Sequence, residues 1–262
     1  MMRVFLELAY DGTRYHGWQR QPHSISVQEV LEDTMARLFG GVCSVMGCGR
    51  TDTGVHARYF VAHAMLPDGC LGERVASLDE AVLKLNGMLP HDIGIYAMHR
   101  VGDKAHARFD AVERGYTYWI HTEKDPFLDG RSTRVYGELD LTAMEAASKH
   151  LVRKGDFASF CKAGSDQGTT ICDVRKAKWE VLAPHRLAFH ISADRFLRNM
   201  VRATVGTLIE VGKGKRQPDD LVDILEAKDR SAAGKSVLGC GLYLTQVVYP
   251  KDVFTPAAAE YL

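Results

Sequence analysis

The sequence lacks an excess of charge of either sign. Lys+Arg and Asp+Glu both total 33 among 262 residues, so the formal net charge is zero. Chains that bind nucleic acid are usually basic overall, so composition alone argues against such a partner. Exposed charges more than roughly 8 Å apart are largely screened at physiological salt, so a local basic patch would still be enough.

Long apolar runs and paired cysteines are also missing. No stretch approaches the roughly 20 apolar residues that span a bilayer, and the opening MMRVFLELAYDG is too short and polar for a signal peptide. The six cysteines form no C-x-x-C pair, the histidines show no H-E-x-x-H, and no strand is followed by G-x-G-x-x-G. We therefore expect a cytoplasmic protein with reduced thiols, no bound metal and no dinucleotide cofactor.

Strand and helix patterns alternate along the chain in two similar halves. Period-two strand patterns cover residues 3–10, 42–49, 58–66, 92–101, 114–122, 174–182, 186–193 and 241–249. Helical spacing covers residues 26–39, 78–89, 141–152, 198–212 and 219–227. Ser26 with Glu29, and Thr142 with Glu145, have the spacing of capping boxes.

The order of these elements predicts an α+β fold. Two pseudo-repeated β-α-β-β-α-β-like halves imply largely antiparallel sheets with helices on one face. We expect the division near residue 108, which gives an N-terminal half of residues 1–107 and a C-terminal half of residues 108–262.

The stretch GRTDTGVHA, residues 49–57, by itself allows two interpretations of Asp52, and Asp11 suggests a third function. Asp and Gly are common turn formers, so the motif by itself is typical of a turn. An aspartic protease needs two aspartates sharing a proton, and the chain has no second D-T-G or D-S-G. A dimer could supply the second aspartate, but Arg50 and Thr51 stand where such a protease has apolar strand residues. An aspartyl-phosphate enzyme is suggested by Asp11-Gly12-Thr13, but that motif needs another aspartate where Ala9 stands.

The longer context resembles the tRNA pseudouridine synthase A (TruA) family. GRTDTGVHA is similar to its catalytic motif, and YDGTRYHGWQRQ at 10–21 to its opening segment. ARFDAVERGYTYWI at 107–120 resembles its central tyrosine strand, and FLRNMVRATVGTLIEVGKGK at 196–215 its C-terminal helix. The four stretches follow family order across nearly the whole chain. One departure is Thr53, where bacterial members commonly carry alanine.

The resemblance implies the pseudouridine synthase fold and the isomerisation of uridine to pseudouridine at positions 38 to 40 of the tRNA anticodon arm. It implies tRNA as a partner, a homodimer, and no cofactor. It also implies catalytic roles for Asp52, Tyr116 and Arg202, with Asp52 as the essential nucleophile. Three routes stay open: attack on C1′ of ribose, attack on C6 of uracil, and a glycal route.

Side-chain chemistry adds further expectations for these residues. Residues i and i+2 of an extended segment share a face, so the guanidinium of Arg50 can reach Asp52 and keep it ionised. The target base must be flipped out, and Tyr116 is expected to stack on it, whereas Tyr118 is expected in the sheet core. We expect His56 to hold the catalytic loop.

Basic residues cluster near residue 200. Arg195, Arg198 and Arg202 follow at i, i+3 and i+7, which predicts one face of a helix. We expect Arg195 and Arg198 to contact phosphate. Further candidates for RNA contacts are Arg14, Arg58, Arg20, Lys213, Lys215 and Arg216.

A second function is compatible with the same residues. A tRNA-binding protein that keeps the fold without activity could act as a folding chaperone. Intact Arg50, Asp52 and Tyr116 favour the enzyme.

Overall fold

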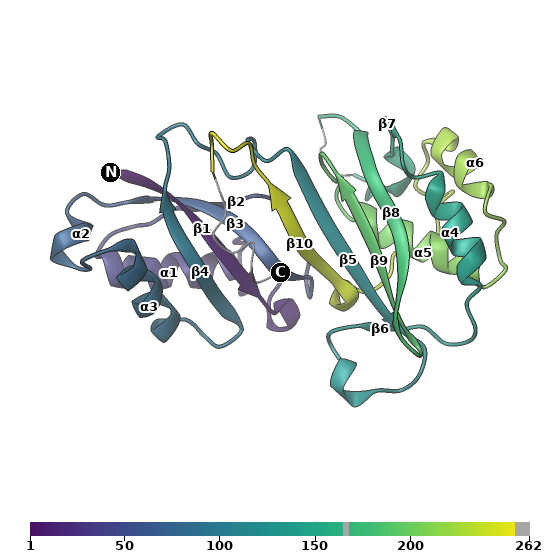
Figure 1. The fold of residues 1–262 in the computed structure, drawn as a ribbon, viewed down its shortest axis with the longest axis horizontal. Helices are drawn as coiled ribbons and strands as arrows, with labels where there is room; N and C mark the ends of the chain where they lie inside the picture. Colours follow the sequence, from purple (N-terminus) through teal and green to yellow (C-terminus); the bar gives the residue numbers. More distant parts are fainter. Residues whose placement is uncertain (165–167, 255–262) are drawn as a thin grey trace. The chain divides into compact units, whose positions relative to one another are not determined.

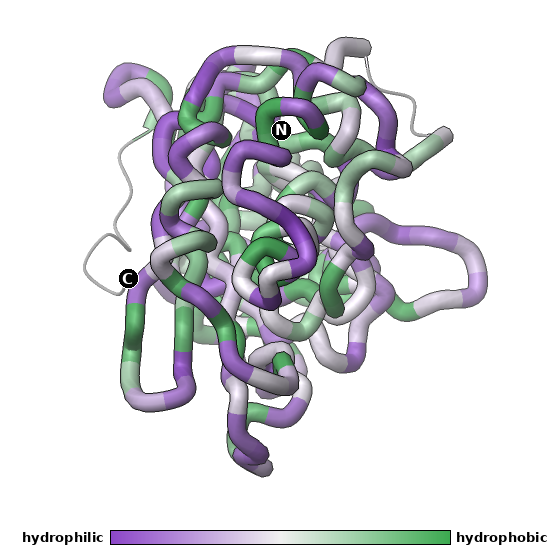
Figure 2. The backbone as a smooth tube through the Cα atoms, turned by 90° about the vertical axis from the view of Figure 1, so that its right-hand side faces the viewer, coloured by the Kyte–Doolittle hydropathy of each residue, from purple (hydrophilic) through white to green (hydrophobic). Residues whose placement is uncertain are grey.

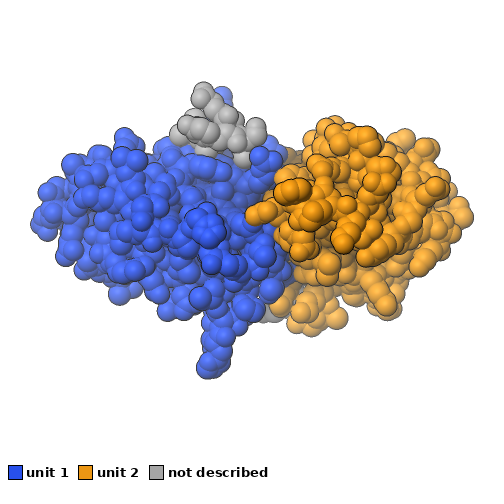
Figure 3. Space-filling view, turned by 90° about the horizontal axis from the view of Figure 1, so that it is seen from below, with its two compact units in different colours: residues 1–112, 244–262 blue, residues 113–243 orange. Residues whose placement is uncertain are grey.

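A computed structural model describes residues 1–164 and 168–254 of the chain. The chain divides into two compact units, coloured separately in Figure 3. Unit 1 consists of two segments of the chain, Met1–Val112 and the residues from Leu244 onward. Unit 2 is the segment between them, Glu113–Tyr243. We expected the division near residue 108; the chain passes into unit 2 five residues later and leaves it again within its last strand.

Unit 1 has the expected β-α-β-β-α-β order. Its strands are β1 (Met2–Tyr10), β2 (Val45–Gly47), β3 (His56–Leu66) and β4 (Ile93–Arg100), and its helices are α1 (Val27–Phe39), the short α2 (Cys70–Glu73) and α3 (Leu78–Met88). The strands lie in the order β4-β1-β3, both neighbours of β1 are antiparallel to it, and β2 pairs with β3. Figure 1 shows α1 and α3 side by side along this sheet.

Local sequence explains where α1 begins and ends. The side chain of Ser26 accepts a hydrogen bond from the backbone N–H of Glu29, as the N-cap prediction requires. Gly40 ends the helix in the left-handed conformation, with φ +74°. A capping box would also have the Glu29 carboxylate accept the backbone N–H of Ser26. Here that carboxylate pairs with the guanidinium of Arg20 instead.

Unit 2 contains five further strands. Its strands are β5 (Glu113–His121), β6 (Thr133–Arg134), β7 (Lys154–Asp156), β8 (Ile171–Ala183) and β9 (Arg186–Ala193). They lie in the order β5-β9-β8-β7, with antiparallel pairs throughout, and β6 pairs with β5 in parallel. The helices are α4 (Leu141–Lys149), α5 (Met200–Gly212) and α6 (Asp220–Ala227). The last strand of the chain is β10 (Leu242–Val248), which belongs to unit 1 from Leu244 onward. The α+β prediction with largely antiparallel sheets is therefore confirmed.

Two helix starts differ from the sequence prediction. Helix α4 is capped by Asp140, whose carboxylate accepts the N–H of Ala143, and not by Thr142. Asp140 is fixed there because its own N–H donates to the carbonyl of Gly212 on α5, 2.8 Å away. Helix α5 begins at Met200, because Asn199 adopts a left-handed conformation with φ +66°.

Because α5 begins at Met200, the predicted basic face of this helix does not exist. Arg195 and Arg198 precede α5 and are not part of it. Within α5 every residue is buried except Arg202 and Glu210. The helix is therefore an interior element with one arginine near its first turn, and the i, i+3, i+7 pattern was wrong as a description of one helical face.

Apolar residues fill the interior of each unit. Val4, Leu6 and Leu8 are fully buried on β1, as are Phe189 on β9 and Leu208 on α5. In Figure 2 the outer loops are mostly hydrophilic, whereas hydrophobic segments gather toward the interior. Within the described ranges, no helix combines the length and apolar character needed to cross a membrane.

Candidate active site

Asp52 lies in the loop that joins β2 to β3. The N–H of Val55 donates to the carbonyl of Asp52 at 3.1 Å, which closes a four-residue turn. Gly54 is the third residue of this turn and has φ +72°, a conformation that side chains disfavour. The motif therefore is a turn, as its residue types indicate, and the turn is what presents the carboxylate.

Residues 10–18, the opening segment, form hydrogen bonds with this turn. The N–H of Trp18 donates to the carbonyl of Thr51 at 3.3 Å, and the N–H of Gly54 donates to the carbonyl of Tyr15 at 3.3 Å. The hydroxyls of Tyr10 and Thr51 are 2.9 Å apart. Residues on both sides of Asp52 are thus bonded to residues 10–18, and the position of the carboxylate depends on that segment.

Two glycines allow the close approach. A Cβ added at Gly17, which has φ +88°, would lie 2.2 Å from the carbonyl oxygen of Thr51. One added at Gly12 would lie 2.0 Å from the carbonyl oxygen of Val55. Backbone packs directly on backbone at both points, so neither position tolerates a side chain without movement of the turn.

His56 anchors the end of the turn. Its ring is 1% exposed, and Nδ1 accepts the N–H of Gly12 at 3.0 Å. The same Nδ1 lies 3.1 Å from Oδ1 of Asp11. These contacts support the loop-holding role that we expected for His56.

Arg50, the electrostatic partner expected for Asp52, is more exposed than the aspartate. Asp52 is half-buried and Arg50 is exposed. Thr53, the residue that departs from the family pattern, is exposed, so its methyl and hydroxyl groups need no space in the core.

The tyrosine strand in unit 2 separates two roles. Tyr118 is fully buried and donates its hydroxyl to the carbonyl of Leu238 at 2.8 Å, which confirms its place in the core. Tyr116 is only half-buried and meets the ring of Phe196 edge-on at 5.0 Å between centroids. Phe196 was not predicted from sequence, because the contact joins β5 to the segment before α5.

Arg202 is held by the segment that precedes β10. Its Nε donates to the carbonyl of Val237 at 2.8 Å, and the N–H of Val237 donates back to the carbonyl of Arg202 at 3.2 Å. The same segment continues to Leu238, which accepts the hydroxyl of Tyr118. Ser236 also accepts a hydrogen bond from Asn199 at 2.6 Å. Residues 236–238 therefore connect the start of α5 to β5, a role that no sequence signal indicated.

The remaining basic candidates differ in how much of their charge is engaged. Arg198 is exposed, whereas Arg195 is half-buried and its N–H donates to Asp194. Arg14 forms an ion pair with Asp92 at 2.6 Å, and Arg58 is exposed on β3.

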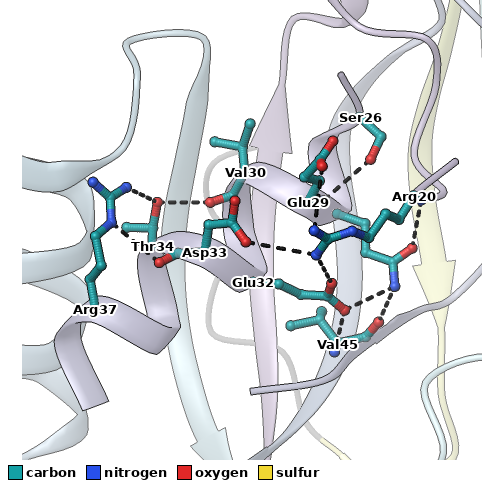
Figure 4. Close-up of polar contacts among 10 residues, drawn as sticks. Arg20, Ser26, Glu29, Val30, Glu32, Asp33, Thr34, Arg37 and Val45 are labelled. Carbon is teal, nitrogen blue, oxygen red and sulfur yellow. Dashed lines mark hydrogen bonds and ion pairs between the residues drawn. The ribbon is translucent and has the colours of Figure 1, made fainter. Parts of the chain in front are cut away.

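Among these basic residues, Arg20 and Arg216 have their charges most fully neutralised by neighbouring carboxylates. Arg20 faces three carboxylates of α1, Glu29, Glu32 and Asp33, at 3.3 to 3.7 Å (Figure 4). Arg216 pairs with Glu210 at 2.6 Å. Lys213 and Lys215 are exposed after α5. The structure therefore weakens the case for Arg20 as a phosphate ligand and leaves Arg198, Lys213 and Lys215 open to solvent.

Comparison with known proteins identifies relatives across the chain. A family described as tRNA pseudouridine synthase matches residues 147–250. A protein of Porphyromonas gingivalis named tRNA pseudouridine synthase A is 48% identical over 97% of this chain and 100% of its own length. Proteins with the same name in Bacteroides fragilis and Oleidesulfovibrio alaskensis are 46% and 38% identical, over 97% and 98% of this chain and 99% of their own lengths in both cases.

Proposed function

Because the chain belongs to the tRNA pseudouridine synthase A family, we propose that it isomerises uridine in tRNA to pseudouridine with Asp52 as the nucleophile. The observation that carries this proposal is the turn of residues 52–55, closed from Val55 to Asp52 and bonded on both sides to residues 10–18. A half-buried carboxylate held by backbone contacts is suited to covalent chemistry, because its position does not depend on a flexible side-chain network.

The reaction moves one bond and one proton. The N1–C1′ bond of uridine breaks, the uracil turns, and a C5–C1′ bond forms. The hydrogen on C5 leaves and N1 takes up a proton, so no electrons are gained or lost and no redox cofactor is needed. The proposed targets are positions 38 to 40 of the anticodon arm.

Each proposed residue has a distinct task. Tyr116 stacks on the flipped base and assists proton transfer at C5, with its ring braced by the edge contact with Phe196. Arg202 acts at the reacting nucleotide, oriented by its bond to Val237. Arg50, which is exposed, is available to bind a phosphate or to approach Asp52 when RNA excludes water.

Release of tritium from the substrate tests the proposal. Uridine labelled with tritium at C5 in tRNA loses the label to water when the C5–C1′ bond forms. We expect release by the wild type and none by Asp52→Ala or Asp52→Asn, while both variants still bind tRNA in a filter assay. The Asn variant keeps the shape of the side chain, so its inactivity would separate charge from packing.

The same assay separates the enzyme from an inactive tRNA-binding protein. If the wild type binds tRNA but releases no tritium, or if Asp52→Ala releases as much as the wild type, the catalytic proposal is wrong. We also propose that the protein acts as a homodimer in the cytoplasm. Sedimentation velocity with and without tRNA checks the dimer, and a monomeric sedimentation coefficient in both would contradict it.

A further inference from the structure

The carboxylate of Asp92 lies immediately before β4 and holds two consecutive side chains of the opening segment. Its side chain is 8% exposed. One oxygen accepts the Nε–H of Arg14 at 2.6 Å, and the other accepts the hydroxyl of Tyr15 at 2.6 Å. Burial alone would raise the pKa of Asp92, but the hydrogen bonds from Arg14 and Tyr15 lower it below its usual value. The group therefore stays ionised inside the fold.

Tyr15 connects this carboxylate to the turn that presents Asp52. The carbonyl of Tyr15 accepts the N–H of Gly54, two residues after Asp52. The side chain of the same residue is bonded to Asp92 and is 4% exposed. The backbone of Asp92 adds a second restraint, because its carbonyl accepts the N–H of Asp11 at 2.9 Å. A shift of Tyr15 would therefore be passed to the turn through one backbone bond.

We infer that Asp92 is a positioning residue for the nucleophile: it fixes Tyr15, and Tyr15 fixes the Gly54 end of the Asp52 turn. This inference rests on the proposed role of Asp52. Asp92 acts on the nucleophile through Tyr15 and does not touch the substrate, whereas its second bond, to Arg14, bears on a candidate RNA contact. Loss of the Tyr15 hydroxyl, which leaves the Arg14 to Asp92 pair in place, is expected to lower the rate of the chemical step without weakening the binding of tRNA.

Unit 1 contains a matched network that serves as the control. The fully buried carboxylate of Glu7 accepts the hydroxyl of Tyr59 at 2.9 Å and lies 2.6 Å from Nε2 of His99. Both networks thus join a buried carboxylate to a tyrosine hydroxyl and a basic side chain. The second network joins β1, β3 and β4 and lies outside residues 50–55.

The experiment compares Tyr15→Phe and Asp92→Asn with Tyr59→Phe by tritium release from labelled tRNA and by urea unfolding. We expect Tyr15→Phe to lower kcat about tenfold, less than the roughly 10²-fold cost of a 1 Å displacement, because the backbone bond from Gly54 to Tyr15 remains. The KM for tRNA should stay within about twofold of the wild-type value. Tyr59→Phe should lower the urea midpoint by about as much as Tyr15→Phe does. It should leave kcat unchanged.

The double variant tests whether the two residues act in sequence. If Asp92 works through Tyr15, Tyr15→Phe combined with Asp92→Asn should be no slower than Asp92→Asn alone. Fully multiplicative losses in kcat would overturn the inference. If Asp92→Asn does not fold, the comparison of kcat between Tyr15→Phe and Tyr59→Phe tests the inference alone. A lower kcat in Tyr15→Phe only would support it, and equal values would overturn it.

The remaining outcomes are distinct. An unchanged kcat in Tyr15→Phe, or a loss confined to KM, overturns the positioning role while Asp52 stays essential. Tritium release by Asp52→Ala at the wild-type rate overturns the proposed function itself, and the positioning role with it.

Discussion

The sharpest test of the packing around Asp52 is the substitution Gly17→Ala. The added Cβ would lie 2.2 Å from the carbonyl oxygen of Thr51 and 3.1 Å from the carbonyl carbon of Asp52, both backbone atoms. Real Cβ contacts essentially never fall below 3.0 Å, so one backbone must move by about 0.8 Å relative to the other. The turn that carries the nucleophile lies at this contact, so it is the part expected to shift.

The energetic cost has two parts. A non-glycine residue in a left-handed conformation costs about 1–2 kcal/mol, and forcing an atom into a filled space costs about 1–3 kcal/mol. We expect the free energy of unfolding to fall by about 2–5 kcal/mol, a large fraction of the roughly 5–15 kcal/mol that stabilises a typical domain. A displacement near 1 Å at a reacting group can cost about 10²-fold in rate, so kcat should fall by that order.

Urea unfolding and tritium release measure the two effects. Gly102→Ala is the matched control, because a Cβ there has nothing within 4 Å and its φ is not positive. Its unfolding free energy should stay within about 0.5 kcal/mol of the wild-type value. If Gly17→Ala behaves like Gly102→Ala in both assays, the contact between the opening segment and the turn does not constrain Asp52.

Three further predictions concern charge, protonation and capping. Replacing Arg198 with Gln should reduce the slope of log binding constant against log salt by about one unit if it contacts phosphate, whereas Arg20→Gln should leave the slope unchanged because three carboxylates already surround Arg20; equal slopes for both variants would remove Arg198 from the footprint. Burial lowers the pKa of His63 to about 4, and its Nδ1 accepts the N–H of Ala107. The unfolded chain takes up a proton on this ring below about pH 6.5 while the folded protein does not, so stability should fall as pH drops from 6.5 to 4, by up to about 3 kcal/mol at 1.36 kcal/mol per pKa unit. Urea titrations across that range should show a smaller fall for His63→Gln, and an identical fall would show that His63 is not responsible. Ser26→Ala removes the hydrogen bond to the N–H of Glu29 and should lower the unfolding free energy by about 1 kcal/mol; no change in the urea midpoint would mean that the cap contributes nothing.

Local signals in the sequence predicted much of the fold. The start of α1 at Ser26 depends on a hydrogen bond three residues along the chain, so its pattern is visible locally. The start of α4 was missed because Asp140 and Thr142 can both cap, and the choice depends on the bond from Asp140 to Gly212, which is distant in sequence. The left-handed Asn199 was missed for the same reason, since its side chain is held by Ser236.

The candidate site was predictable in its residue types and less so in its supports. The four stretches that carry the family resemblance contain Asp52, Tyr116 and Arg202. What holds them comes from residues distant in sequence: Asp92 holds Tyr15, Phe196 braces Tyr116, and Val237 orients Arg202. Neither periodicity nor spacing indicates such contacts. The contact expected between Arg50 and Asp52 stays a prediction, and the turn that begins at Asp52 was visible in its residue types.

The return of the chain to unit 1 at Leu244 also has a consequence during synthesis on the ribosome. Residues 113–243 separate the two parts of unit 1, so 131 residues must be made between Val112 and Leu244. At about 5–20 residues per second this delay is roughly 7–26 s. During that time the half that carries Asp52 lacks the N–H···O bond from Val112 to Val248. In a chain truncated near residue 243, unit 1 would therefore be the incomplete unit, although residues 1–112, which include Asp52, would all be present.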